Sequence, residues 1–577
     1  MERRVLLAIF LSFLVLYTYQ SLFVPAPKPA PSAAPSPNAT DAAAAAHKPA
    51  PAAVESAAGQ PATPVAAPLV GVTAERDVRV ETDEVIAVFT NRGARLKSWR
   101  LKRYRDEKGE PLELVAGDLG SAQPLPFSLR VPDEAATRTL NSALYEVKSA
   151  PADATAARSA PLIFEYRDSA GLQAIKEFQF DPAPYAFTFH AFVKIGDRPE
   201  VPVVEWGPAV STSSREAGKS ARQAGGVIYQ NGKLLRIRPA DLAKQSVYEG
   251  NSGYAGVDDH YFVTMAISPG PSKVSLHPVA IPRAPTGSTS EQPAAELMSW
   301  AIEPASDAPI QFYAGPKDLV KLQAIDPALG KVIDFGWFDF IVVPLLRALN
   351  WIHGYVGNYG WSIIILTVLI NAVMFPLRHK SVVSMRKMQQ IQPEAKAIQE
   401  RYAKLKTTDP ARQKMNQELM ALYRERGVNP ASGCVPMLLT MPVFFAFYAM
   451  LTVAIELRGA PFFGWIHDLS RPDPLYIIPI LMGLTQIWQM RITPQTGTDP
   501  AQQKMMMVMP VVFMFFFLWT SAGALLYWLV SNVWGIGQQY LTNYLIGPPT
   551  VRTVRPPAER LMKRVGSGKT DAASRED

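Results

Sequence analysis

Uncharged polar side chains inside apolar segments are the residues of this chain whose types and spacing could bind another molecule. Thr367 and Asn371 are four residues apart in one apolar run, so a helix would place both on the same face. Other apolar runs carry further hydroxyl and amide groups, namely Thr440, Gln486, Gln489, Ser531, Asn532 and Gln538. Each could hydrogen-bond a neighbouring helix, and together they could line a hydrated recess. The chemistry that they offer is hydrogen bonding, not the making or breaking of covalent bonds.

Signals for catalysis, nucleotide binding and metal binding are weak. The segment 565–570 looks like a phosphate-binding loop, but Lys563 occupies the position of the first glycine of that motif. The seven histidines are scattered without the spacing of a metal site, and no nucleophile elbow is present. We therefore expect a protein that is not an enzyme and that has no metal and no cofactor.

Charged residues are absent from the interiors of the apolar runs that we predict to span a membrane. A proton-coupled transporter is expected to keep an ionisable residue near the middle of the bilayer. An ion or solute transporter with an extracytoplasmic sensor domain is therefore the alternative function rather than the preferred one. A third interpretation, an anchor that displays a β domain, leaves the charged hairpin described below unexplained.

Five apolar runs define a predicted membrane core, a five-helix bundle within residues 354–546. They are 359–377, 434–455, 475–490, 505–520 and 525–546. At 1.5 Å per residue, about 19 helical residues cross a hydrocarbon core of roughly 30 Å. The third and fourth runs have about 16 residues each, or roughly 24 Å of helix. These two helices would thin the bilayer or be extended by flanking residues.

The N-terminal region contains a predicted anchor and a predicted tether. Arg3 and Arg4 precede an apolar run, so residues 1–24 form either a transmembrane signal anchor, which we prefer, or a cleaved signal. Residues 25–70 are rich in Pro and Ala, and they predict an extended tether because they cannot bury enough apolar surface to fold.

Two further segments lie between the tether and the membrane core. Residues 71–328 show short alternating runs separated by Gly, Pro, Asn and Asp, which predicts an all-β domain of the sandwich type. Residues 329–353 are mostly apolar but carry Asp334, Asp339 and Arg347, so no clean span fits inside them. We interpret this second segment as an interfacial amphipathic helix.

The segment 378–430 is too charged to enter a bilayer and predicts a hairpin of two helices. Apolar residues at coiled-coil spacing form the seam of its first helix, and they are Met388, Ile391, Ala395, Ile398, Tyr402 and Leu405. We expect Pro393 to interrupt this helix, and Asp409 with Pro410 to start the second. Met385, Met388 and Met415 could receive an unfolded apolar segment, since methionine adapts to many shapes. Alternatively, the hairpin only caps the bundle.

The distribution of positive charge orients the chain. The formal net charge is +8, and Lys and Arg are concentrated in the hairpin and in the tail 547–577, whereas the loop 456–474 has only Arg458 and Arg471. By the positive-inside rule, the hairpin and both termini are cytoplasmic and the β domain lies on the other side. Membrane topology thus explains the charge without a specific nucleic-acid target, although the basic tail could equally contact the ribosome. The single cysteine, Cys434, excludes a disulfide within one chain.

Several short motifs occur in order along the C-terminal half: NWIHGYVGN at 350–358, MALY at 420–423 with VNP at 428–430, GCVP at 433–436, WIHDL at 465–469 and VSN at 530–532. With these motifs, and with its anchor, tether, β domain and five-span core, the sequence resembles the YidC/Oxa/Alb family of membrane protein insertases. It looks like the Gram-negative type, which has a large periplasmic domain. The resemblance covers the whole architecture and is strongest over residues 314–546.

The resemblance implies a multi-domain protein with a β-supersandwich in the periplasm and a polytopic helical core in the inner membrane. In this family the core forms a polar groove, open to the cytoplasm and to lipid, that inserts and helps to fold inner-membrane proteins. The implied partners are nascent membrane proteins, the lipid bilayer and the Sec translocon, beside which such proteins act when they do not act alone. The implied groove residues are Thr367, Asn371, Arg378, Thr440, Gln486, Ser531 and Asn532. Substrate-contacting positions of the family match Tyr527 and Trp528, where aromatic residues could equally pack or form an interfacial belt.

One position departs from the family pattern. Many members carry a positive residue in the groove at the position of Asn371, whose amide can hydrogen-bond a substrate but cannot attract its acidic groups by charge. Arg378 lies seven residues later, close to the same helix face, and side chains lean toward the helix N-terminus. We hypothesise that Arg378 supplies the positive potential of the groove from its cytoplasmic mouth; otherwise it is an ordinary positive-inside anchor. A kink at Pro376 would alter this geometry.

Overall fold

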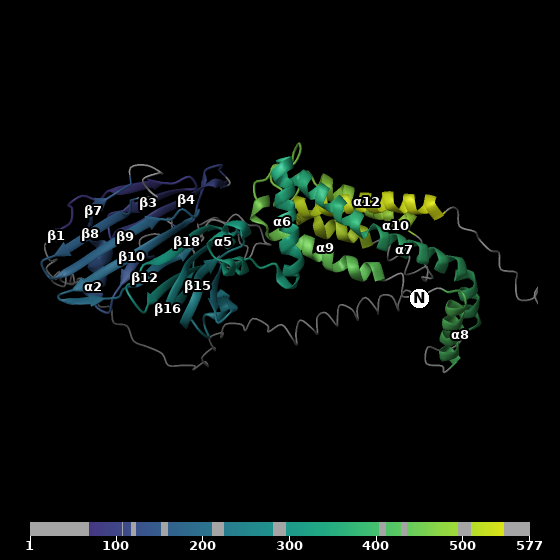
Figure 1. Cartoon of the computed structure of the whole chain (residues 1–577), viewed down its shortest axis with the longest axis horizontal. Helices are drawn as coiled ribbons and strands as arrows, with labels where there is room; N and C mark the ends of the chain where they lie inside the picture. Colours follow the sequence, from purple (N-terminus) through teal and green to yellow (C-terminus); the bar gives the residue numbers. More distant parts are fainter. Residues whose placement is uncertain are drawn as a thin grey trace, which may run out of the picture. The chain divides into compact units, whose positions relative to one another are not determined.

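A computed structural model describes residues 68–106, 108–116, 123–151, 160–209, 224–280, 296–402, 411–427, 435–493 and 509–546. The predicted anchor 1–24, most of the predicted tether and the tail 547–577 lie outside these residues, as do Asp409, Pro410 and Cys434. The described chain consists of a β-rich domain followed by a helical C-terminal part (Figure 1).

The β-rich domain contains two antiparallel sheets. The path through the 14-stranded sheet is β1-β8-β9-β10-β18-β16-β15-β13-β14, and the 4-stranded sheet has the order β2-β3-β4-β5. The strands of the small sheet are β2 (Asp77–Glu81), β3 (Val85–Thr90), β4 (Arg95–Arg105) and β5 (Pro111–Glu113). Those of the large sheet are β1 (Pro68–Val70), β6 (Ser128–Arg130), β7 (Glu146–Ser149), β8 (Leu162–Asp168), β9 (Leu172–Phe180), β10 (Ala186–Ile195), β11 (Arg198–Glu200), β12 (Val203–Ala209), β13 (Gly225–Gln230), β14 (Lys233–Ile237), β15 (Val247–Asp258), β16 (Phe262–Ala280), β17 (Glu296–Pro304) and β18 (Ile310–Pro316).

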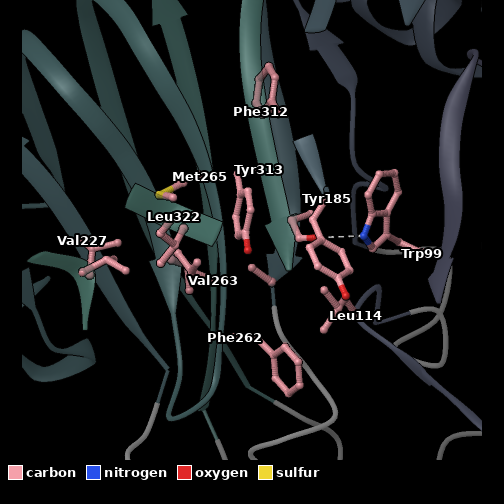
Figure 2. Close-up of a cluster of buried hydrophobic side chains, with 14 of the residues drawn as sticks. Trp99, Leu114, Tyr185, Val227, Phe262, Val263, Met265, Phe312, Tyr313 and Leu322 are labelled. Carbon is pink, nitrogen blue, oxygen red and sulfur yellow. Dashed lines mark hydrogen bonds between the residues drawn. The ribbon is translucent and has the colours of Figure 1, made fainter. Parts of the chain in front are cut away.

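Aromatic side chains fill the core of this domain. Phe127 packs against Phe178, Phe189 and Phe312 with ring centroids 4.7–5.2 Å apart, in tilted or edge-on geometry. Trp99 of β4 donates its Nε1–H to the carbonyl of Ala314 in β18 at 2.9 Å, as the dashed line in Figure 2 shows. This bond joins the small sheet to the large one, so the two sheets share one core.

The domain is β-rich, as the alternating runs predict, but it is not all-β. Helix α2 (Glu134–Ser142) begins at Asp133, whose side chain accepts a hydrogen bond from the Ala135 amide, and it buries Ala136 and Leu140. Helix α5 (Leu319–Ile325) begins in the same way at Asp318. Both helices are short and bury few residues each. Their apolar residues are therefore too few to show the helical period of 3.6 residues among the alternating runs of the strands.

A lysine occupies an inward-facing position of β9. This strand buries every second residue, and Lys176 is one of them. The Lys176 Nζ donates to the carbonyls of Gly93 and Phe127 at 2.6 and 2.7 Å. Both residues have positive φ, so the ammonium group holds two tight backbone turns against the sheet. Burial lowers the pKa of Lys176 well below its ordinary value, because desolvation penalises the charged form.

The helical part comprises α6 (Asp339–Val356), α7 (Tyr359–Arg401), α8 (Ala411–Glu425), α9 (Val435–Val453), α10 (Ile477–Ile492), the helix Met509–Trp519 and α12 (Ala522–Ile546). Within the described residues, α7 is the helix that is both long and apolar enough to cross a membrane by length and composition. Met441–Val453 and Met509–Trp519 are shorter apolar helices. The region 329–353 is more broken than we predicted. Two short 3-10 turns, Pro327–Val332 and Gly336–Phe338, precede α6 because Asp326, Pro327 and Gly336 interrupt regular helix there.

Helix α7 is continuous from Tyr359 to Arg401, through both Pro376 and Pro393. The expectation that Pro393 interrupts the first helix of the hairpin is therefore wrong. A proline removes one backbone hydrogen bond of a helix, and the remaining bonds on either side can keep the helix intact. The apolar run and the charged segment that follows it are thus parts of one helix.

Glu456 lies in the 3-10 turn Ile455–Leu457, just after α9. Its Oε1 accepts a hydrogen bond from Asn350 of α6 at 3.3 Å, and Asn350 Oδ1 accepts one from the Tyr359 hydroxyl at 3.3 Å. Burial raises the pKa of Glu456 to about 7, and the nearby Asp318 carboxylate adds to the rise. The turn after α9 therefore contains a carboxyl group that is partly protonated near neutral pH.

We predict that Lys176→Met destabilises the β-rich domain by about 2–4 kcal/mol, because the buried carbonyls of Gly93 and Phe127 lose their donor. Denaturant unfolding of the full chain in detergent, followed by tryptophan fluorescence, measures the change. Lys97→Met is the matched control, since it removes only an exposed ion pair with Asp77 and should cost less than about 0.5 kcal/mol. Equal stability of the two variants would contradict the role of Lys176.

We also predict that Glu456 makes the chain less stable as the pH rises. Its folded-state pKa of about 7 lies above its ordinary value of 4.5, so folding favours the protonated form. The stabilisation is complete below about pH 4.5 and is lost as the pH rises through about 7. Glu456→Gln keeps an acceptor for Asn350 but cannot ionise, so its melting temperature should fall less over this range. The exposed Glu249→Gln is the control, and an unchanged pH slope for Glu456→Gln would refute the prediction.

Candidate functional site

The two predicted site residues in the apolar part of α7 are buried and are bonded within their own helix. Thr367 is 0% and Asn371 is 5% exposed. Thr367 Oγ1 donates to the Ile363 carbonyl at 2.6 Å, and Asn371 Nδ2 donates to the Thr367 carbonyl at 2.8 Å. The two residues share a face, as their spacing predicts, but these donors turn to the α7 backbone instead of to another helix.

Helices α10 and α12 bring together several of the predicted residues. Trp528 Nε1 donates to Gln486 Oε1 at 3.1 Å. Asn532 Nδ2 lies 3.3 Å from both the Met482 carbonyl and Thr485 Oγ1. Thr485 is a member of this cluster that the sequence analysis missed, although its position next to Gln486 could have suggested it. The cluster joins α10 to α12 by polar contacts inside an apolar bundle.

The two predicted substrate-contacting aromatics make extensive packing contacts. Tyr527 stacks on Phe447 of α9 with a centroid distance of 4.3 Å and an interplanar angle of 7°. Trp528 packs edge-on against Phe444 and Phe517, at 5.0 and 4.9 Å. Tyr527 is nearly fully buried and Trp528 is half-buried. These rings fix the position of α12 against α9 and against the helix Met509–Trp519.

Further along α12, buried polar atoms are left without partners. Among the described residues, Trp534 Nε1 and Gln538 Oε1 are buried and have no hydrogen-bond partner, whereas the buried Ser531 hydroxyl lies beside Tyr527. With Tyr527, these residues recur every three or four positions and so share one face of α12. Trp534 was not among the predicted site residues, although this spacing could have identified it. The face retains donors and acceptors that water or another molecule could satisfy.

Arg378 lies on the part of α7 that packs against the C-terminal turns of α12. The two helices pack in parallel, since Gln538 Nε2 donates to the Phe375 carbonyl at 3.4 Å and Thr542 lies beside His379. Arg378 is half-buried, three residues after Phe375 on α7.

The charged segments form a hairpin in which α8 packs on the second half of α7. Arg426 Nη2 donates to both carboxylate oxygens of Glu394, at 2.7 and 2.9 Å, and the Tyr402 hydroxyl donates to Glu418 at 2.7 Å. The apolar seam beside these contacts is buried, and it includes Ile391, Ala395 and Leu419. The methionines expected to receive a substrate are half-buried, and they are Met385, Met388 and Met415.

The opposite end of the bundle is closed by the loop between α9 and α10. Asp473 is fully buried, and its carboxylate accepts bonds from Trp465 Nε1 at 2.9 Å and from the Ile478 amide at 2.8 Å. The same loop accepts the first amides of α12, because Gly523 donates to the Leu469 carbonyl at 2.9 Å. The backbone at this end is thus satisfied by protein groups.

One predicted residue cannot be placed. Thr440 belongs to α9, but its side chain lies outside the described residues. Within the described residues, no group of three or more His, Cys, Asp or Glu side chains could hold a metal ion.

Comparisons with known proteins cover both parts of the chain. Residues 77–348 match the family described as the YidC periplasmic domain, and residues 351–547 match the 60Kd inner membrane protein family. The chain is 36% identical to a membrane protein insertase YidC from Pelobacter propionicus over 95% of this chain and 100% of the relative. It is 48% identical to that of Campylobacter jejuni over 40% of this chain and 43% of the relative.

Among solved structures, an active YidC insertase with its first transmembrane domain resolved matches 83% of this chain and 95% of its own, at 17% identity and a TM-score of 0.35. The likeness to the curated relatives runs along almost the whole sequence at more than a third identity. The chain therefore belongs to the YidC family of membrane protein insertases.

Proposed function

We propose that this chain inserts integral membrane proteins into the bacterial inner membrane and helps them to fold. Its β-rich domain lies in the periplasm, and the hairpin and both termini lie in the cytoplasm. The observation that carries the proposal is that one face of α12 has buried, unpartnered polar atoms, Trp534 Nε1 and Gln538 Oε1, and that Gln538 contacts α7 at Phe375, close to the end of the apolar part of α7. A nascent segment that arrives from the cytoplasm meets hydrogen-bonding groups there before it meets lipid.

The physical task of such a site is to lower the free-energy barrier to moving the polar groups of a substrate across the bilayer. A charged residue at the bilayer centre costs about 2.5–3.5 kcal/mol on insertion scales. A hydrated groove lined by Thr367, Asn371, Gln486, Ser531 and Asn532, with Thr440 on α9, would reduce this cost while the apolar part of the substrate moves into lipid. Burial of that apolar part drives the process, so no cofactor or nucleotide is required.

Arg378 supplies the positive charge of this groove in our proposal. Its half-buried position at the end of the apolar run supports a guanidinium group that is partly withdrawn from bulk water. An acidic residue in a substrate would be attracted there, because Coulombic forces are strong where water is partly excluded. Tyr527 and Trp528 would line the path as aromatic surfaces.

The hairpin is the receiving element in the cytoplasm. Its half-buried methionines, Met385, Met388 and Met415, offer an adaptable apolar surface to an emerging segment. The Sec translocon is a partner for substrates that need it, and the basic tail 547–577 is a candidate contact for the ribosome. An ion or solute transporter is the less favoured function, because the apolar run of α7 carries no charged residue before Arg378.

Depletion of the protein tests this function. Small inner-membrane proteins should fail to insert when the chain is depleted, and re-expression should restore them. Photo-crosslinking from position 371 to a nascent chain would place the substrate at α7. Normal insertion after depletion would reject the insertase function and leave the transporter as the better explanation.

We predict that Arg378→Ala lowers the insertion yield severalfold for substrates with acidic translocated segments and little for neutral ones, because only the former are drawn by charge. Arg378→Lys keeps the charge and should retain most activity. Asn371→Ala is the comparison variant. If Asn371→Ala is defective and Arg378→Ala inserts acidic substrates normally, then Arg378 is only an ordinary membrane-edge cation.

A further inference from the structure

The C-terminal turns of α12 form hydrogen bonds with α7 on both sides of Pro376. On one side, Gln538 Nε2 donates to the Phe375 carbonyl at 3.4 Å. On the other side, His379 Nδ1 lies 3.3 Å from Thr542 Oγ1, and Arg386 Nη2 donates to Asn543 Oδ1 at 2.6 Å. We call these three contacts the ladder, whose α12 residues are Gln538, Thr542 and Asn543.

The ladder follows one face of α7. Phe375, His379 and Arg386 are separated by four and seven residues, so they lie in line along the helix. Pro376 falls inside this stretch, and a proline removes one backbone hydrogen bond and bends a helix unless neighbours restrain it. Because one continuous helix, α12, holds both sides of the proline, it fixes the direction in which α7 continues.

The hydrogen bonds of the ladder are specific. Gln538 and Thr542 are 6% and 0% exposed, so loss of the bonds made by Gln538 Nε2 and by the Thr542 hydroxyl would be costly. The Asn543 contact is charge-assisted and short, and Gln539 Nε2 also donates to Asn543 Oδ1 at 2.9 Å, which orients the amide toward Arg386. Alternative directions of α7 would leave these groups unpaired.

The direction of α7 sets the place of the hairpin. Helix α8 is bound to the end of α7 by the Arg426–Glu394 and Tyr402–Glu418 contacts and by the buried Leu419. A rotation at Pro376 would therefore carry α8 and the methionines of the hairpin with it.

We propose that Gln538, Thr542 and Asn543 are positioning residues that hold the cytoplasmic hairpin in register with the groove. This inference rests on the proposed function, because it gives the hairpin a fixed position next to the site that accepts the substrate. Thr542 and Asn543 need not touch the substrate, and Gln538 contacts α7 through its Nε2 while its Oε1 belongs to the candidate site. They act through α7.

Distances between spin labels test the ladder directly in the full chain. Cys434→Ser provides a cysteine-free background, and the exposed Lys396 and Arg491 are replaced by labelled cysteines, one on the hairpin and one at the end of α10. We expect one narrow distance distribution in the parent. The triple variant Gln538→Leu, Thr542→Val, Asn543→Leu should broaden and shift this distribution, and it should also lose insertion yield.

Matched variants separate position from simple stability. The single variant Thr542→Ser keeps a hydroxyl at this position while Gln538 and Asn543 stay native, so it should keep the narrow distance distribution. Tyr544→Leu, at a position that is 86% exposed on the same turn, should change neither distance nor yield. If the triple variant does not fold, Asn543→Leu alone should still broaden the distribution.

An unchanged distance distribution in a folded ladder variant would overturn the inference, whatever its insertion yield. A broadened distribution with normal insertion would also overturn the inference, since insertion would then not depend on a fixed position of the hairpin. Failure of the parent to insert any substrate would instead reject the proposed function, while the label distances would still report on the ladder.

Discussion

The parallel packing of α12 along α7 is the interaction on which the helical part of the molecule depends. The two helices touch along the line that runs from the buried polar atoms of α12 to the Asn543–Arg386 contact. Helix α12 also packs on α9 and α10. Displacing it would separate Trp528 from Gln486, Tyr527 from Phe447 and Asn532 from Thr485 at once. The candidate site is therefore one cooperative unit rather than a set of independent side chains.

Sequence periodicity identified the faces of the helices but not their partners. The spacing of Thr367 and Asn371 correctly put both on one face, yet their donors close on the α7 backbone, an option open to any Thr or Asn in a helix. Trp528 and Gln486 are 42 positions apart, and nothing local to either residue specifies that they meet. The continuity of α7 was also hidden, because a proline is a strong local signal whose cost tertiary contacts can offset.

The same limit applies to the β-rich domain. Alternation along β9 predicts the strand correctly, but a rule based on polarity would turn Lys176 toward solvent. The structure instead buries it, because the carbonyls of Gly93 and Phe127, far away in the sequence, form an acceptor site inside the core. Residue types predict burial well only where no distant polar group can satisfy them.

The place of the positive charge also has a physical consequence for a site that must release what it binds. A guanidinium group deep in a low-dielectric bundle would hold an acidic residue by several kcal/mol, and such a contact would slow release. Arg378 is half-buried at the end of the apolar run. In the proposed function, it would attract an acidic group on entry while water still weakens the pair. A neutral Asn371 would then offer the segment a hydrogen-bonding group without a second charge, which suits a transit site better than a tight one.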